Sequence, residues 1–328
     1  MTVEPTIGIV IIGRNEGERL TACLDSIRDA AARTVYVDSG STDDSISNAS
    51  QAGADVVELP MDQPFTAGRA RNAGFERLCE LHPDINYVQF IDGDCRVAEG
   101  WLDFAARYLQ QNTDVVVVCG RRKEIHPKDS VYNDLCDFEW NTPVGESDAC
   151  GGDFMVVAAA FSAVNGFSAA LIAGEEPELC FRLRQAGGKI YRADQLMTWH
   201  DAAMHSIVQW ARRTQRAGYA YAARSAMHRH VAGGLARREN LRIVVWAAVL
   251  PFMIVVAGSL HPGGWLLALL YPMQLLRLRQ QIQKTDPEAP AGKFAALLLL
   301  GKWPEFYGQL TFLSRWLRGA EQTLIEYK

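Results

Sequence analysis

The 328-residue sequence lacks several features that mark particular classes of protein. It has no basic excess: the net charge is −5, which argues against a protein that neutralises nucleic-acid phosphates. Its seven cysteines are scattered, odd in number and free of any C-x-x-C pair. We therefore expect reduced thiols in a cytosolic compartment, and neither a disulfide framework nor a cysteine zinc site. The N-terminal residues have no basic segment followed by an apolar run and a cleavage site, so they predict a strand and not a signal peptide.

Several catalytic motifs are also missing. The sequence has no G-x-G-x-x-G after a strand and no P-loop, which argues against the usual dinucleotide and P-loop phosphate sites. It has no G-x-S-x-G elbow and no H-E-x-x-H, which argues against serine hydrolases and zinc proteases. What remains is a composition that is 48% hydrophobic and 22% charged, ordinary for a globular protein. The length allows one large domain, or one domain with an appendage.

Short β-branched runs alternate with helical patterns over the first 121 residues. Such alternation predicts an α/β protein with a mostly parallel sheet. Strands are predicted at residues 6–13, 34–40, 55–59, 86–92 and 114–121, and helices at residues 15–27, 41–54, 67–81 and 101–111.

Polar groups follow three of these predicted strands. Residues 14–16 (Arg-Asn-Glu) follow the first strand, Asp38 lies at the end of the second, and Asp92-Gly93-Asp94 end the strand at 86–92. Because ligands bind beyond the carboxyl ends of strands in open α/β sheets, these groups predict the rim of an acidic pocket. Asp92 and Asp94 can aim two carboxylates at one hard cation. For the pair taken alone, a solvated turn is the alternative.

Other polar residues allow two interpretations. Arg71 lies near a helix start, where it can face a diphosphate or solvent. Glu175 and Glu176 precede Pro177 at the start of another predicted helix, where acids are stabilised by the helix dipole. A carboxylate that protrudes from a helix start is also a suitable general base. His200, beside an aspartate, is either a metal ligand or a structural histidine.

Six stretches, taken together and in order, resemble the family 2 glycosyltransferases, inverting enzymes of the GT-A fold. The resemblance covers residues 6 to 205. It implies a nucleotide-binding, Rossmann-like mixed sheet flanked by helices. The stretches are IGIVIIGRNEGERLTACLDSI, VYVDSGSTDDS, AGRARNAG, FIDGDCRV, GGDFMVVAAAFSAVNGF and GEEPELCFRLRQAGGKI.

The resemblance implies a role for each matching residue. It makes Glu176 the catalytic base, with Glu175 as a substitute, and Asp94 the principal metal ligand. The family commonly has aspartate where this chain has Glu176, which keeps the chemistry on a longer side chain. The stretch 151–153 matches the family's acceptor loop, but the basic pair that often follows is absent at residues 156–157. The other implied contacts are Asp92 and His200 with Mg²⁺ or Mn²⁺, and Gly13, Arg14, Asn15, Glu16, Asp38, Arg71, Asp92 and Gly93 with the nucleotide.

The C-terminal third has a different composition. Residues 206–242 carry eight arginines and one acid, and the next 34 residues, 243–276, carry no Asp, Glu, Lys or Arg. The apolar runs 243–258 and 264–276 contain 16 and 13 residues, fewer than the roughly 20 that a spanning helix needs, and each contains a proline. Arginines flank both runs, which favours a hairpin inserted from the cytosol. We therefore predict a catalytic domain at 1–205 and a membrane-associating helical region at 206–328, with a soluble helical subdomain as the alternative.

Taken together, these features predict a metal-dependent hexosyltransferase that acts on a UDP- or GDP-linked sugar with inversion. The expected acceptor is a lipid-linked saccharide in surface polysaccharide assembly, at the cytoplasmic face of the inner membrane. A polyprenyl-phosphate sugar synthase and an inactive sugar-nucleotide-binding scaffold are the alternatives. A processive synthase is disfavoured because residues 209–213 match Q-x-x-R-W only loosely, and a nucleotidyltransferase because the glycine-rich basic loop is missing. No nucleic-acid partner is expected, and a homo-oligomer is compatible with the sequence.

Overall fold

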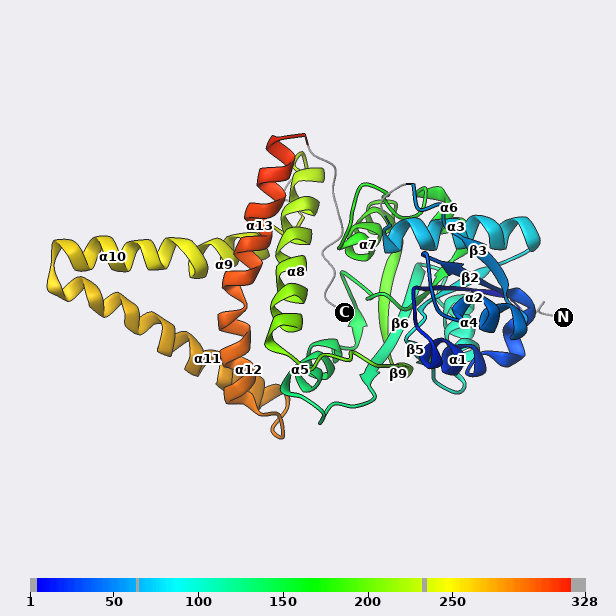
Figure 1. Ribbon diagram of the computed structural model, residues 1–328, viewed down its shortest axis with the longest axis horizontal. Coiled ribbons are helices and arrows are strands. Elements are labelled where there is room, and N and C mark those ends of the chain that lie inside the picture. The colour runs from blue at the N-terminus through cyan, green and yellow to red at the C-terminus, as the bar shows by residue number, and fades with distance from the viewer. Residues whose placement is uncertain (1–4, 63–64, 232–234, 320–328) are drawn as a thin grey trace. The chain divides into compact units, whose positions relative to one another are not determined.

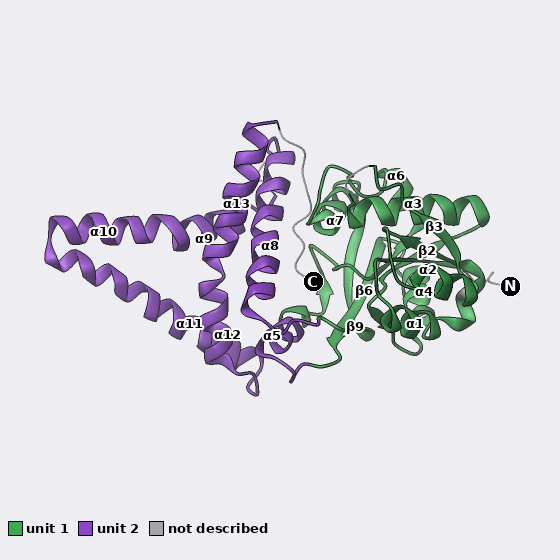
Figure 2. Ribbon diagram, viewed as in Figure 1, with its two compact units in different colours: residues 1–126, 139–202 green, residues 127–138, 203–328 purple. Residues whose placement is uncertain are grey.

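The computed structural model describes residues 5–62, 65–231 and 235–319. The chain divides into two compact units, coloured separately in Figure 2. We call residues 1–126 and 139–202 the sheet unit, and residues 127–138 and 203–328 the helical unit. Each unit is described by itself below.

The sheet unit is built on one mixed sheet, whose order among the described residues is β3-β2-β1-β4-β8-β6-β9-β5, with β7 paired to β9. Strands β1 to β4 pair in parallel, whereas β8 is antiparallel to both of its neighbours. Beyond β4 the sheet is mixed, because β6 pairs in parallel with β9 whereas β5, β7 and β8 make antiparallel pairs. The mixed sheet implied by the family resemblance is thus confirmed. The alternation of strands and helices did not predict the short antiparallel strands, which carry little sequence signal. The strands are β1 (Ile7–Gly13), β2 (Thr34–Asp38), β3 (Asp55–Glu58), β4 (Tyr87–Asp92), β5 (Cys95–Val97), β6 (Val115–Glu124), β7 (Gly145–Glu146), β8 (Phe154–Val157) and β9 (Lys189–His200).

Helices cover both faces of this sheet (Figure 1). The crossovers from β1 to β2 and from β3 to β4 run in opposite directions, so right-handed connections place α1 and α3 on opposite faces. The range predicted for the helix at 67–81 is confirmed by α3. The helices are α1 (Glu18–Asp25), η1 (Arg28–Arg33), α2 (Ser45–Gln51), α3 (Ala67–Leu81), α4 (Trp101–Gln111), α5 (Val131–Trp140), α6 (Ala158–Ala163) and α7 (Glu175–Gln185); α5 crosses the boundary between the units.

An aromatic cluster holds the middle of the sheet unit together. The ring of Phe90 on β4 lies 5.3 Å from that of Phe154 on β8, 5.2 Å from that of Phe161 on α6 and 5.6 Å from that of Phe167. All four side chains are buried. Tilted aromatic pairs at such distances are each worth about 0.5–1.5 kcal/mol beyond burial. The cluster therefore holds β4 and β8 together, and with them α6 and the segment around Phe167.

The helical unit contains a close crossing of α8 and α13. A Cβ atom at Gly218 on α8 would overlap the backbone of Glu305, and one at Gly308 on α13 would overlap the backbone of Gln215. Glycine at both positions thus lets the two backbones touch, much as small residues do at other tight helix crossings. The helices of this unit, besides part of α5, are α8 (Ile207–Met227), α9 (Arg237–Val244), η2 (Val245–Val249), α10 (Leu250–Leu260), η3 (Pro262–Leu269), α11 (Leu270–Thr285), α12 (Ala291–Leu300) and α13 (Lys302–Leu317).

One helix in the described part of the chain is long and apolar enough to cross a membrane. It runs without a break through α9, η2 and α10, from Arg237 to Leu260, over 24 residues with a hydropathy of 2.4 in its most apolar window. The sequence suggested a run of only 16 residues, interrupted by Pro251. The helix continues because a π-helical turn, Val245–Val249, comes just before the proline and shifts the hydrogen-bond ladder there. Figure 1 shows α10 and α11 as the two arms of a hairpin.

Candidate functional site

The loops after β1 and β2 are tied to each other at the carboxyl edge of the sheet. Asn15 adopts the left-handed conformation, with φ 55°. Its amide donates to Ser41 Oγ at 2.9 Å, and its Oδ1 accepts from the Thr42 amide at 2.7 Å. Asp38 is buried, and one of its oxygens accepts from the amides of Gly40 and Ser41 at 2.9 and 2.8 Å. Asp38 thus closes its own turn, and its contact with a nucleotide stays a prediction.

Gly93 lies directly against the loop after β1. Its amide donates to the carbonyl oxygen of Ile12 at 2.8 Å. A Cβ at this position would lie 3.1 Å from that oxygen and 3.3 Å from Cγ of Glu16. Glu16 itself pairs with Arg19 at 2.8 Å. The Asp-Gly-Asp turn therefore packs beside residues 13–16, as the sequence predicted, and glycine is needed because a side chain would push the two loops apart.

Arg71 on α3 joins the end of β4 to the start of α7. Its Nη2 lies 2.6 Å from Asp92 Oδ1, and its Nη1 lies 3.0 Å from Glu175 Oε1. Arg71 is 3% exposed, so the guanidinium end of both ion pairs is buried, whereas the Asp92 side chain is 28% exposed. Burial opposes ionisation of Asp92, but the guanidinium groups of Arg71 and Arg122 outweigh it and lower the pKa of that carboxyl. Arg71 thus positions three elements of the site, and its predicted role at the nucleotide is untested by these contacts.

A second buried carboxylate supports the same turn from below. Asp153, which is fully buried, accepts hydrogen bonds from the Asp92 amide at 3.1 Å and Thr198 Oγ1 at 2.7 Å. It also pairs with Arg122 Nη2 at 2.8 Å. Gly152 leaves room for this arrangement, because a Cβ there would lie 2.7 Å from Asp92 Oδ2. The loop 151–153 and the Asp-Gly-Asp turn are therefore one packed unit.

Asp94 faces His200 across the pairing of β5 with β9. Cys95 on β5 lies opposite His200 on β9 in that ladder, which places Asp94 Oδ1 3.3 Å from His200 Nε2. Both side chains are buried, and the Nδ1 atom of His200 has no hydrogen-bond partner within the part of the chain that the structure describes. The ligand atoms of Asp94, Cys95 and His200 all lie within 4.8 Å of one another. The predicted metal ligands Asp94 and His200 are thus brought together, whereas Asp92 faces Arg71 and Arg122.

Glu175 and Glu176 occupy the first turn of α7, where the helix dipole favours their ionised forms. Glu175 pairs with Arg71, but Glu176 accepts hydrogen bonds from the Cys150 amide at 2.5 Å and the Cys180 thiol at 3.1 Å. Burial raises the pKa of Glu176 above its ordinary value, against the effect of these bonds. Glu175 is therefore held by the Arg71 guanidinium, whereas Glu176 is a buried carboxylate with a raised pKa.

Residues 8–147 match the family model for "Glycosyl transferase family 2". The chain carries a glycosyl transferase family 2 domain. The resemblance seen in the motifs is confirmed over these residues.

Comparison with solved structures bears on the fold. The mannosyltransferase PcManGT from Pyrobaculum calidifontis, in complex with GDP-Man and Mn²⁺, superposes with a TM-score of 0.63. It is 14% identical, over 95% of this chain and 88% of its own. The α/β GT-A fold with a helical extension is therefore confirmed. GalNAc-T7 with UDP, GalNAc and Mn²⁺, and TarS from S. aureus, each give a TM-score of 0.48, with 16% and 13% identity, 68% and 94% coverage of this chain, and 51% and 55% coverage of theirs.

Two residues that contact the candidate site were not found from the sequence. Arg122 lies near the end of β6, 5.7 Å from the ring of Trp140, and pairs with Asp153. The signal that could have found it is the Arg-Arg pair at the end of the apolar run 115–119. Trp140 also makes an edge contact with His200, at 4.6 Å between ring centres. It lies at the end of α5, and no sequence pattern connects it with a strand end far along the chain.

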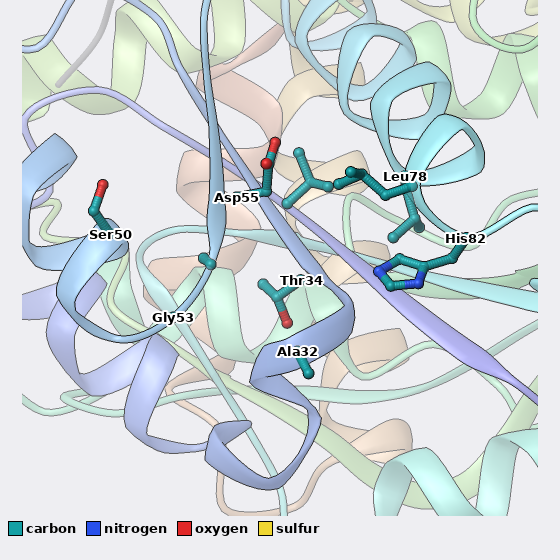
Figure 3. Close-up of a pocket in the computed structure, with 10 residues that line it drawn as sticks. Ala32, Thr34, Ser50, Gly53, Asp55, Leu78 and His82 are labelled. Atoms are coloured by element: carbon teal, nitrogen blue, oxygen red, sulfur yellow. The ribbon is translucent and has the colours of Figure 1, made fainter.

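A cavity of about 390 Å³ lies elsewhere in the family 2 domain, as Figure 3 shows. Its lining includes Thr34, at the start of β2, and Asp55, at the start of β3. It is therefore at the amino ends of the parallel strands, opposite the edge that carries Asp38 and Asp92. Asp55 is already paired with Arg77 at 2.8 Å. For these reasons we do not assign the donor site to this cavity.

Proposed function

We propose that this protein is an inverting, metal-dependent glycosyltransferase that transfers a hexose from a UDP- or GDP-linked donor to an acceptor hydroxyl. The observation that carries the proposal is a chain of contacts at one sheet edge. The pair Asp94–His200 lies beside Asp92, which Arg71 connects to the first turn of α7 and so to Glu176. An ion-paired acidic cluster and a buried carboxylate thus belong to one chain of contacts.

The residues at Asp94 fit a divalent cation. Two ligands at right angles around an ion with bonds of about 2.1 Å are about 3.0 Å apart, and Asp94 Oδ1 and His200 Nε2 are 3.3 Å apart. Nε2 is the ring atom of His200 that faces Asp94, so it is the atom that would bind the ion. PcManGT, which shares the fold, was solved in complex with GDP-Man and Mn²⁺. When bound, such an ion stabilises the departing nucleoside diphosphate as a Lewis acid.

Protein side chains supply the general base and position the groups of the site. Glu176 accepts the proton of the acceptor hydroxyl while that oxygen attacks the anomeric carbon from the face opposite the leaving diphosphate. Its raised pKa makes it a stronger base than an exposed glutamate. Arg71 holds Glu175 and Asp92 in place, and Asp153 with Arg122 keeps the Asp-Gly-Asp turn from moving. Preorganised charge of this kind removes reorganisation from the reaction step.

Asp94→Ala is expected to raise the Mn²⁺ concentration required for half-maximal donor turnover at least about tenfold, because it removes a direct ligand. The measurement is hydrolysis of a panel of UDP- and GDP-hexoses over a Mn²⁺ titration. The control is Asp103→Ala, an exposed carboxylate in the first turn of α4. An unchanged Mn²⁺ requirement in Asp94→Ala would contradict the metal assignment.

We propose a lipid-linked saccharide as the acceptor, in the assembly of a surface polysaccharide. Two features support it: the apolar hairpin, and a cavity of about 450 Å³ whose lining includes Arg121, Lys123 and Arg192. Cationic groups of this kind can bind the phosphates of a lipid carrier. The alternative is a polyprenyl-phosphate sugar synthase, for which the lipid phosphate itself is the acceptor. Mass analysis of the product separates a new sugar–sugar bond from a new sugar–phosphate bond.

We propose that the hairpin associates with the cytoplasmic face of the inner membrane, either lying on it or inserted into it. The side chains of three residues in the hairpin are largely exposed: Phe252 (69%), Leu260 (82%) and Leu266 (66%). Large exposed apolar side chains that lie together mark sites that contact a membrane or another protein. Burying one such side chain is worth about 1.5–3 kcal/mol, so Leu260→Gln is expected to lower vesicle partitioning about tenfold or more. Flotation with phosphatidylglycerol vesicles measures this, with Val144→Gln, 52% exposed in the sheet unit, as control. Equal flotation of both variants would contradict the proposal.

A further inference from the structure

Two cysteines surround the carboxylate of Glu176. Cys150 lies in the loop before β8 and Cys180 on α7, and their Sγ atoms are 3.4 Å apart. Cys180 Sγ is also 3.1 Å from Glu176 Oε1. The ligand atoms of all three residues lie within 4.8 Å of one another. Because the cysteines are far apart in the sequence and form no short motif, the sequence had argued against a cysteine zinc site.

We propose that Cys150, Cys180 and Glu176 form a binding site for a thiophilic divalent cation such as Zn²⁺, distinct from the site at Asp94. Thiolate ligands select Zn²⁺ over Mg²⁺ and Mn²⁺, whereas oxygen ligands suit the latter two. As each Zn–S bond forms, the thiol releases its proton to solvent. Such an ion would inhibit sugar transfer, because the carboxylate oxygen of Glu176 that binds it could no longer accept the proton of the acceptor hydroxyl. This consequence rests on the proposed function.

The distances favour a metal over a disulfide. In a tetrahedral zinc site with Zn–S bonds of about 2.3 Å, two sulfur atoms lie about 3.8 Å apart, so the sulfur atoms here must separate by only about 0.4 Å. A sulfur and a carboxylate oxygen on the same ion lie about 3.5 Å apart, again close to the 3.1 Å observed. A disulfide needs an S–S distance of about 2.05 Å, which requires an approach of more than 1 Å from the 3.4 Å seen here.

The surroundings of the two thiols also disfavour oxidation. Burial raises the pKa of both, that of Cys180 to about 11. Thiols rather than thiolates are therefore present near neutral pH, and peroxides react slowly with them. A bound cation displaces the thiol proton, so the raised pKa of the thiols does not prevent metal binding. Cys150 is the least buried of the three residues.

The test uses the full-length, reduced and metal-free protein, with Co²⁺ as a spectroscopic probe for Zn²⁺. We expect a cobalt–thiolate charge-transfer band in the near ultraviolet, bleached by added Zn²⁺. The band should be lost in Cys150→Ser and in Cys180→Ser. It should persist in Cys79→Ser, a partly buried cysteine on α3, and in Asp94→Ala. Circular dichroism of each variant checks folding, and the two serine variants test the site independently.

A second arm measures donor turnover at saturating Mn²⁺ with increasing Zn²⁺. Zn²⁺ should inhibit the wild type at least tenfold more strongly than Cys180→Ser. Absence of the band in the reduced wild type, or a band that survives both serine variants, would overturn the site. A mass lower by two hydrogens without added oxidant would also overturn it, because a disulfide would then be the preferred state. A band without any sugar transfer would leave the site standing and reject the proposed function instead.

Discussion

Glu176→Gln is expected to lower kcat about 10²–10⁴-fold, the usual contribution of a general base. Glutamine preserves the shape of the side chain and keeps an oxygen that accepts from the Cys150 amide and the Cys180 thiol. What it removes is the ability to take a proton from the acceptor hydroxyl. Donor binding should therefore change little, and the loss should be confined to transfer. Steady-state transfer assays with the donor found in the Mn²⁺ titration give kcat and KM separately.

Glu175→Gln is the matched comparison, because the two acids are neighbours in the same helical turn. Glu175 pairs with Arg71 at 3.0 Å, whereas no ion pair in the described part of the chain involves Glu176. We expect Glu175→Gln to act mainly by loosening Arg71, with a smaller loss of kcat. The assignment is wrong if Glu175→Gln loses most of the activity while Glu176→Gln retains it.

The pH dependence provides an independent check of Glu176. Burial raises the pKa of Glu176 above the ordinary 4.5, and the base works only when ionised. Activity should therefore fall, as the pH is lowered, at a higher pH than for an exposed glutamate. A carboxyl whose pKa is raised by folding contributes stability below its unfolded pKa and loses it as the pH rises through the folded value. Glu176→Gln should thus be at least as stable as the wild type near pH 7, measured by thermal unfolding.

Much of the sheet edge could be predicted from the sequence because its elements have strong local patterns. Strand β4 is a short apolar run that ends in Asp92, and helix α3 has a clear 3.6-residue period with Thr66 as its N-cap. Parallel strands then place Gly13, Asp38 and Asp92 at one edge, whatever the rest of the chain does.

The remainder of the site depends on contacts that no local pattern encodes. Asp94 meets His200 only because the three-residue strand β5 pairs with the end of β9. Arg122 reaches the Asp-Gly-Asp turn beside a register shift between Arg121 and Arg122, which breaks the simple alternation of side chains. The Cys150–Cys180 pair likewise depends on how the loop before β8 packs on α7. In each case tertiary packing decides which side chains meet.

Asp153→Ala is expected to lower the free energy of unfolding of the sheet unit by about 3–5 kcal/mol, the cost of removing one partner from a buried ion pair. The change removes the acceptor of the Thr198 hydroxyl and of the Asp92 amide, at 2.7 and 3.1 Å. It also leaves Arg122 with Asp92 Oδ2 at 3.6 Å in place of the closer contact at 2.8 Å. Buried donors without acceptors are costly because water cannot replace the lost bonds.

Urea unfolding measures this prediction, followed by hydrogen exchange of the β4 amides so that the sheet unit is observed separately. The control is Asp148→Ala, in the same region of the chain. Asp148 pairs with Arg184 at 2.8 Å, but its side chain is 91% exposed. An exposed pair is worth about 0.2–1 kcal/mol, so the control should shift the transition little. Equal shifts in the two variants would mean that Asp153 does not hold the Asp-Gly-Asp turn, and the preorganised site would need another support.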